Sequence, residues 1–206
     1  MSHDSREPVT IPESFSTKRL LLRRWSDRDL AHFASLNADS KVVEFLPAAL
    51  TRADSDLFVQ DRVETHFAEY GYGPWAVQRS DTGDFIGYVG LMWQTFDALF
   101  TPALEVGWRL SRQNWGNGYA TEAARESLRV AFDVLGEEEV VSMTVPQNIK
   151  SIAVMQRIGM TRDPIDDFEH PRLPIGHRLR RHVLHRMPVA RWRASPRESM
   201  SEGARP

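Results

Sequence analysis

The chain of 206 residues is 41% hydrophobic, which is enough for one substantial core, and no linker rich in Pro, Gly or Ser divides it. Its net charge of −2 argues against a dedicated nucleic-acid partner, and the absence of cysteine excludes disulfides, thiolate zinc sites and a cysteine nucleophile. No apolar stretch approaches the ~20 residues that cross a bilayer, so we expect a cytoplasmic protein without a membrane partner.

We expect one folded domain over residues 17–193, between polar and therefore disordered ends at 1–16 and 194–206. Ser26 and Thr51 are good helix N-caps, and the composition of residues 80–84 is typical of a hairpin turn. The order of elements predicts an α+β fold, with a mixed, mostly antiparallel sheet and helices on both faces. The predicted elements are a strand at 18–24, helices at 27–38 and 51–70, strands at 73–79, 85–93 and 104–110, a helix at 118–135, a strand at 140–145, a helix at 148–158, and strands near 161–167 and 179–187.

A turn with two glycines, Gly116 and Gly118, joins the strand at 104–110 to the amphipathic helix that follows. Glycine lets backbone N–H groups approach a ligand closely, because no Cβ stands in the way. The start of the helix directs its unpaired N–H groups and the positive end of its dipole to the same place. We therefore expect this turn to bind a phosphate or a diphosphate.

Two common phosphate-binding motifs fit this turn poorly. A Walker loop needs a lysine directly after its second glycine, and none follows Gly116 or Gly118, which argues against NTP hydrolysis. A Rossmann turn needs a third glycine where this chain has Thr121, and an acidic residue where the next strand ends in Pro-Gln-Asn at 146–148. The turn therefore gives little support to a dinucleotide-binding protein.

The spacing Gln113-x-x-Gly116-x-Gly118 resembles the acyl-CoA loop of the GNAT superfamily of N-acetyltransferases. Residues 17–23, Thr-Lys-Arg-Leu-Leu-Leu-Arg, are similar to the first strand of its branch of ribosomal-protein N-terminal acetyltransferases (RimJ/RimL-like), and residues 148–160 resemble the helix that meets the pantetheine arm. The resemblance covers residues 17–192 and implies a GNAT-like acyl-CoA N-acyltransferase fold, with a bulge in the strand before the loop. It implies that the cofactor contacts are Trp108, Leu110, Gln113, Gly116, Asn117, Gly118, Tyr119, Ala120, Thr121, Asn148 and Ser151.

The resemblance implies an acetyl-CoA-dependent N-acetyltransferase that uses no metal and acts on a primary amine. A protein N-terminal α-amine fits the branch, small amines stay open as acceptors, and a homodimer stays open as the assembly. The first alternative is a CoA-binding sensor or interaction module without catalysis. The second is a dinucleotide-binding protein. Direct transfer, without a covalent enzyme intermediate, agrees with a chain that lacks cysteine.

Acetyl transfer to an amine requires a group that takes the ammonium proton, and Glu105 is our candidate for this base. Strand alternation places it on one face with residues 107 and 109, so an ion pair with Arg109 is the alternative role. Glu122 competes with it, but its place in the first turn of the helix favours a structural role. Ser151 resembles the serine that protonates the leaving thiolate, although its hydroxyl could instead bond its own backbone.

The acceptor should lie between the two early helices, the stretch near residues 93–100 and the late strands. We predict that Trp93, Phe96 and His170 contact it. The spacing of the histidines does not match a metal site. An acidic cluster would either attract a cationic amine or form a solvated turn. Its members are Asp163, Asp166, Asp167 and Glu169.

Overall fold

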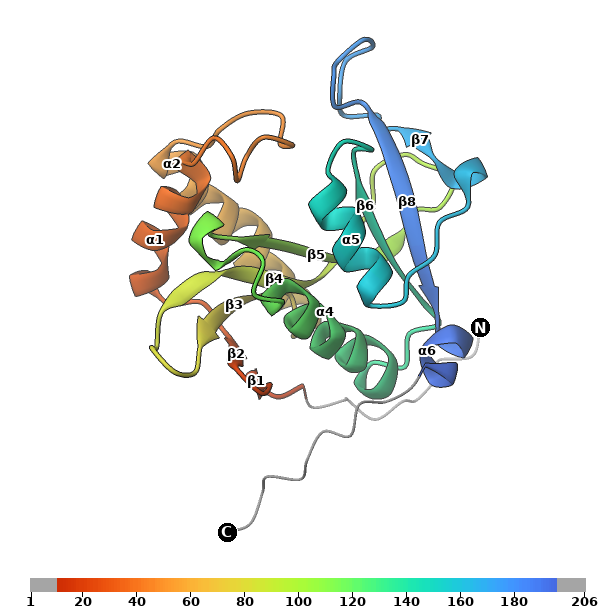
Figure 1. Cartoon of the computed structure of the whole chain (residues 1–206). Coiled ribbons are helices and arrows are strands. Elements are labelled where there is room, and N and C mark those ends of the chain that lie inside the picture. The colour runs from red at the N-terminus through yellow and green to blue at the C-terminus, as the bar shows by residue number, and fades with distance from the viewer. Residues whose placement is uncertain (1–10, 196–206) are drawn as a thin grey trace.

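The computed structural model describes residues 11–195, and a single eight-stranded sheet runs through them in the order β1-β2-β3-β4-β5-β6-β8-β7 (Figure 1). All neighbouring strands are antiparallel except β5 and β6. The strands are β1 (Ser14–Ser16), β2 (Leu20–Arg23), β3 (Pro74–Arg79), β4 (Phe85–Gln94), β5 (Ala103–Leu110), β6 (Glu139–Thr144), β7 (Phe168–Glu169) and β8 (Arg181–Pro188).

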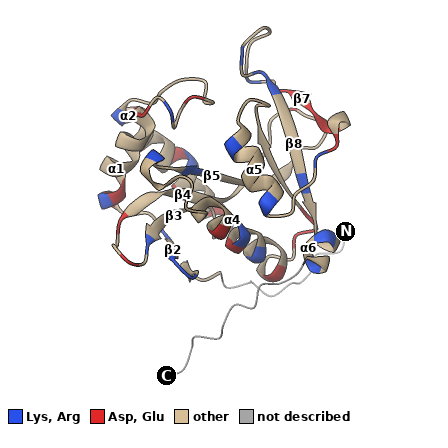
Figure 2. Cartoon of the chain, viewed as in Figure 1, with Lys and Arg blue, Asp and Glu red and all other residues tan. Residues whose placement is uncertain are grey.

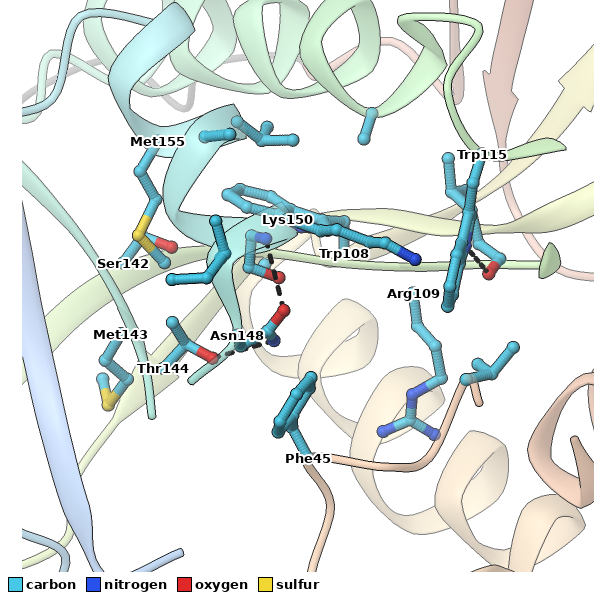
Figure 3. A pocket seen from close by; sticks show the side chains of 18 of the residues that line it. Phe45, Trp108, Arg109, Trp115, Ser142, Met143, Thr144, Asn148, Lys150 and Met155 are labelled. Atoms are coloured by element: carbon cyan, nitrogen blue, oxygen red, sulfur yellow. Dashed lines mark hydrogen bonds between the residues drawn. The ribbon is translucent and has the colours of Figure 1, made fainter. Parts of the chain in front are cut away.

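Helices lie on both faces of this sheet, as the sequence predicted. In Figure 3, α4 and α5 lie on one side of β5 and the helices of the N-terminal half lie on the other. The helices are α1 (Asp27–Ala38), α2 (Arg52–Leu57), α3 (Thr65–Tyr70), α4 (Tyr119–Arg129), α5 (Ile149–Arg157) and α6 (Val189–Ala194), with π-helical turns η1 (Phe58–Glu64) and η3 (Val130–Val134) and 3₁₀ turns η2 (Arg112–Asn114) and η4 (Pro164–Asp166).

The first helix begins where the sequence placed it, for a local reason. The carboxylate of Asp29 accepts hydrogen bonds from the backbone N–H and the hydroxyl of Ser26. It also receives two bonds from the guanidinium of Arg23, at 2.7 and 2.8 Å. These contacts fix the entry into α1 and hold the helix to β2, since Arg23 belongs to that strand. Asp29 is almost fully buried, so water does not compete for its carboxylate.

Three expectations from the sequence differ from the structure. Residues 14–16 form strand β1, although their composition predicted disorder over 1–16; residues 1–10 and 196–206 lie outside the described range. The strand predicted near 161–167 is wrong: Asp163 caps a 3₁₀ turn that starts at Pro164, and a proline cannot donate to a sheet ladder. The expected bulge in β5 is absent, since its register with β4 is continuous from Gly87↔Leu110 to Gln94↔Ala103.

The parallel pair β5 and β6 is the point at which the sheet opens. Its only ladder pair among the described residues is Glu105↔Val141. On either side of this pair the other strands stay joined, β5 to β4 over eight pairs and β6 to β8 over six. The two strands therefore diverge beyond Glu105, and the wedge between them positions the site.

Candidate active site

A cavity of about 1060 Å³ occupies the wedge between β5 and β6. The side chains of β5 divide it, because successive residues of a strand point to opposite faces. Figure 3 shows Trp108 and Arg109 on opposite sides of β5. We call the two parts the α4 half and the α1 half. The α4 half is lined by residues that include Trp108, Leu110, Gly116, Gly118, Tyr119, Ala120, Thr121, Asn148, Lys150, Ser151 and Met155, and the α1 half by residues that include Phe45, Tyr88, Gln94, Phe96, Glu105, Gly107, Arg109, His170 and His182.

The glycine turn at the mouth of the α4 half presents bare backbone to the cavity. Gly116 and Gly118 have φ angles of 78° and 82°, in the left-handed region that favours glycine. A Cβ on Gly116 would meet no atom of the described chain within 4 Å. Within the described range, the N–H groups of residues 117–121 have no hydrogen-bond partner. The turn therefore presents free N–H donors at the N-terminus of α4, which is the geometry that an anion-binding site requires.

Two residues that precede β2, Thr17 and Arg19, hold this turn in place. Arg19 donates to the carbonyl oxygen of Asn117 at 2.9 Å and to the Glu122 carboxylate at 2.7 Å. Glu122 also accepts from the hydroxyl of Thr17. Although burial alone would raise the pKa of Glu122, the hydrogen bonds from Thr17 and Arg19 lower it. Glu122 is thus a structural anion, which agrees with the role that its position favoured, and is a poor base.

The edge of β5 that faces the wedge supplies further free N–H groups. The N–H of Ser111 bonds to Ile86 on the β4 side, so strand alternation directs the N–H groups of Leu110 and Trp108 toward β6. No ladder pair joins β5 to β6 there among the described residues. An extended ligand with amide groups, laid along this edge, would therefore find backbone partners that the protein leaves open.

The start of α5 forms the opposite wall of the α4 half. Asn148 caps the helix: its Oδ1 accepts from the N–H of Ser151, and its Nδ2 donates to the Thr144 hydroxyl at 3.0 Å (Figure 3). The Ser151 hydroxyl lines the cavity and has no partner within the described range. Lys150 lies with its Nζ 4.1 Å from the centroid of the Trp115 ring, which places a cation beside the glycine turn.

Glu105 lies at the point where the two halves of the cavity meet. Its carboxylate accepts a hydrogen bond of 2.7 Å from the side chain of Gln94 and one from the backbone of Met143. Loss of water around the carboxylate raises the pKa of Glu105 to about 7, and these two bonds only partly offset that rise. The alternative pairing with Arg109 does not form, because the Arg109 guanidinium bonds to Asn37 instead.

The structure brings two of the three predicted acceptor contacts into the α1 half. Phe96 and His170 line it, with ring centroids 4.6 Å apart. Trp93 does not line it, since it pairs with Leu104 and so shares the opposite face of the sheet from Glu105. Of the predicted cofactor contacts, the side chains of Gln113 and Asn117 do not line the cavity, and the Asn117 side chain bonds back to the carbonyl groups at 114 and 115.

Several lining residues were not found by reasoning from the sequence. Gln94 reaches Glu105 only through the register of β4 on β5, which no local pattern encodes. Lys150 carried a signal, as a lysine next to a predicted N-cap, that could have marked it as a phosphate contact.

Arginines pair with most of the acidic cluster that comprises Asp163, Asp166, Asp167 and Glu169. Figure 2 shows acidic positions at β7 beside basic positions on β8. Asp166 bonds to Arg186 at 2.7 Å, and Asp167 pairs with Arg162. The expectation that this cluster attracts a cationic acceptor is therefore not supported. Glu169 likewise pairs with Arg180, and Asp163 caps the 3₁₀ turn η4.

Within residues 11–195 no group of three or more His, Asp or Glu side chains is placed to hold a metal ion. In the same range, no helix has the length and apolar character needed to span a bilayer.

Comparisons with known proteins agree on one family. The model of the acetyltransferase (GNAT) domain matches residues 19–161. The protein YkkB of Bacillus subtilis is 31% identical over 145 residues, which cover 70% of this chain and 83% of YkkB. The structure of a GNAT-family acetyltransferase from Bacillus anthracis superimposes with a TM-score of 0.71 at 22% identity, over 86% of this chain and 99% of that one. The ribosomal-protein-S5-alanine acetyltransferase of Vibrio fischeri shares the fold, with a TM-score of 0.66 at 18% identity, over 89% of this chain and 99% of that one.

Proposed function

The chain belongs to the GNAT family of acetyltransferases, and from this premise we propose that it transfers the acetyl group of acetyl-CoA to a primary amine without a covalent enzyme intermediate. We propose further that the amine is the N-terminal α-amine of a protein or peptide. The observation that carries the proposal is the carboxylate of Glu105, which has a pKa of about 7 at the junction of the two halves of the cavity.

The α4 half suits acetyl-CoA. The open space at Gly116 and the unpaired N–H groups of residues 117–121 fit a diphosphate, with Lys150 near enough to add a positive charge. Pantetheine carries amide groups, and one of its carbonyl oxygens can accept from one of the free N–H groups of Trp108 and Leu110, which leaves the other for the thioester oxygen. In this placement the thioester lies along β5 toward Glu105.

The residues of the junction then divide the chemistry among them. Glu105 takes a proton from the ammonium group, which frees the nitrogen lone pair to attack the thioester carbonyl carbon. An N–H of the open β5 edge, at Trp108 or Leu110, stabilises the negative charge that develops on the carbonyl oxygen. The C–N bond forms and the C–S bond breaks. The attacking nitrogen loses one further proton as it becomes an amide, and this proton replaces the one that the hydroxyl of Ser151 gives to the leaving sulfur. The chain has no cysteine that could carry the acetyl group.

The pKa of Glu105 favours an α-amine over a lysine side chain as the acceptor. An α-amine has an ordinary pKa of about 8, close to that of the Glu105 carboxyl, whereas a lysine amine titrates near 10. Proton transfer to Glu105 is therefore about two to three orders of magnitude less favourable from lysine. The first-strand motif at residues 17–23, which resembles that of N-terminal acetyltransferases, also supports this acceptor.

A thiol-release assay with acetyl-CoA tests the proposal. Three sets of acceptors are compared: peptides with different first residues, the same peptides with a blocked N-terminus and an internal lysine, and small amines. We expect CoA release from the peptides with free N-termini. Release from small amines alone would contradict the peptide acceptor. Binding of acetyl-CoA without release from any set would contradict catalysis and select the CoA-binding sensor.

A further inference from the structure

A partly buried guanidinium in the cavity, that of Arg109, has no carboxylate partner among the described residues. Arg109 donates from Nη1 to the Oδ1 of Asn37 at 2.7 Å, and within the described range its Nε and Nη2 have no hydrogen-bond partner. Other partly buried arginines are paired: Arg23 with Asp29, Arg129 with Glu126, and Arg186 with Glu139 and Asp166. Arg109 therefore differs from them in lacking a negative counterpart.

The unpaired guanidinium is nevertheless held firmly. Asn37 is fully buried, and its Nδ2 donates to the hydroxyl of Ser55, which is also fully buried. The rings of Phe33, Phe58 and Tyr88 lie with their centroids 5.5–5.8 Å from the Cζ of Arg109. The buried hydrogen bonds through Asn37 and Ser55, together with three aromatic rings, thus fix the orientation of the Arg109 guanidinium. No acidic side chain among the described residues neutralises its charge. Leaving a charge unpaired in this way is costly unless a ligand supplies the opposite charge.

The fixed guanidinium lines the same half of the cavity as the proposed base. Glu105, Gly107 and Arg109 share one face of β5, and Figure 3 shows Arg109 directed away from Trp108, toward the side on which Phe45 lies. Gly107 lies between the two charged residues, and a Cβ there would meet no described atom within 4 Å. The floor between Glu105 and Arg109 is therefore open, so a ligand can extend from one residue to the other.

The distance between the two residues limits what such a ligand can be. Four steps along a strand separate their Cα atoms by about 13 Å. The amine and carboxylate of a single α-amino acid are attached to one carbon, so they cannot reach both residues. An extended peptide advances about 3.5 Å per residue, so the side chain of its third residue lies roughly 10 Å from the α-amine. The free edge of a guanidinium, Nε and Nη2, matches the two oxygens of a carboxylate.

Resting on the proposed acetyl transfer at Glu105, we propose that Arg109 binds a carboxylate of the acceptor, placed about three peptide residues from the reacting amine. The carboxylate can come from an acidic side chain at the third residue or from the free C-terminus of a tripeptide. Arg109 is then a specificity residue, and its cavity half selects acceptors that are anionic at this distance. The phosphates of acetyl-CoA are a different anion, which we place at the glycine turn and Lys150, on the other side of β5.

Calorimetric titration of the full chain in the presence of CoA tests the site by binding alone. Hexapeptide amides that differ only in Glu or Gln at the third residue are compared, with the same exchange at the second and fourth residues, and with a tripeptide acid beside its amide. We expect the wild type to bind the peptide with Glu at the third residue, or the tripeptide acid, about tenfold more tightly than its neutral counterpart. Which of the two pairs shows the preference identifies the source of the carboxylate. A ratio near one for both pairs overturns the proposal.

Two substitutions in the α1 half of the cavity and one in the α4 half make the test specific. In Arg109→Gln the preference should fall to within twofold, whereas Lys150→Gln should weaken acetyl-CoA and retain the preference. Gly107→Val, whose side chain enters open space, should prevent peptide binding and leave acetyl-CoA binding intact. A preference that survives in Arg109→Gln, or peptide affinity unchanged in a folded Gly107→Val protein, overturns the proposal.

Thiol release measured on the same samples separates this proposal from the proposed function. A wild-type preference that Arg109→Gln abolishes, without CoA release from any peptide, supports the carboxylate site and contradicts acetyl transfer to peptides. If the acidic and neutral peptides both cause CoA release and bind with equal affinity, the result supports acetyl transfer and contradicts the carboxylate site.

Discussion

The two halves of the cavity are built from different kinds of polar group. The α4 half offers mainly backbone: the N–H groups of residues 117–121 and the free edge of β5. The α1 half offers mainly side chains, among them Glu105 and Arg109 of β5 and His182 of β8. Backbone groups suit a ligand that every member of a family shares. Side chains can change without loss of the fold, so the α1 half, where we place the acceptor, is where members of a family can differ.

The largest expected effect concerns the base on the α1 side. We expect Glu105→Gln to reduce kcat by about 100-fold or more at pH 8, because general-base catalysis is lost there. The wild-type rate should rise as the pH increases through about 7, since only the ionised carboxylate accepts a proton. At pH 6 the wild-type carboxyl is mostly protonated, so the difference between the two proteins should shrink. Steady-state kinetics from pH 6 to pH 8.5 measure it, and equal rates at pH 8 would place the base elsewhere.

The ionisation of Glu105 that raises the rate should lower the stability of the fold. The folded-state pKa of Glu105 lies above its ordinary value, so its contribution to stability is present below pH 4.5 and is lost as the pH rises through about 7. Glu105→Gln removes this loss. The free energy of unfolding of the variant should therefore gain about 2 kcal/mol on the wild type between pH 5 and pH 8. Urea unfolding at both pH values measures this change, and a constant difference would show that the carboxylate is not desolvated.

One added methyl group in the α4 half should weaken the binding of acetyl-CoA. Gly116→Ala should weaken acetyl-CoA binding by about tenfold, because the added Cβ enters the space where we place the diphosphate. Gly176→Ala is the matched control: its φ of 82° resembles the 78° of Gly116, a Cβ there is equally free of neighbours, and it does not line the cavity. Both variants carry the same backbone strain. Equal affinity for acetyl-CoA in the two would show that the turn does not receive the diphosphate.

The same contrast explains how much the sequence could predict. The glycine turn, the caps at Thr51 and Asn148 and the alternation along β5 are local, so residues near one another in the chain encode them. The α1 half depends on long-range contacts. Arg109 meets Asn37 across 72 positions, and Gln94 meets Glu105 only through strand register. The same register turned Trp93 away from the site, because a shift of one residue reverses the face.

A crystal structure of the protein with CoA tests most directly the division of the cavity by β5. We expect the diphosphate on the N–H groups of residues 117–121, and the pantetheine arm along Trp108 and Leu110, with Gly107 and Arg109 left free. CoA that lies across Gly107 and Arg109, or a glycine turn without the diphosphate, would show that β5 does not divide the cavity in this way.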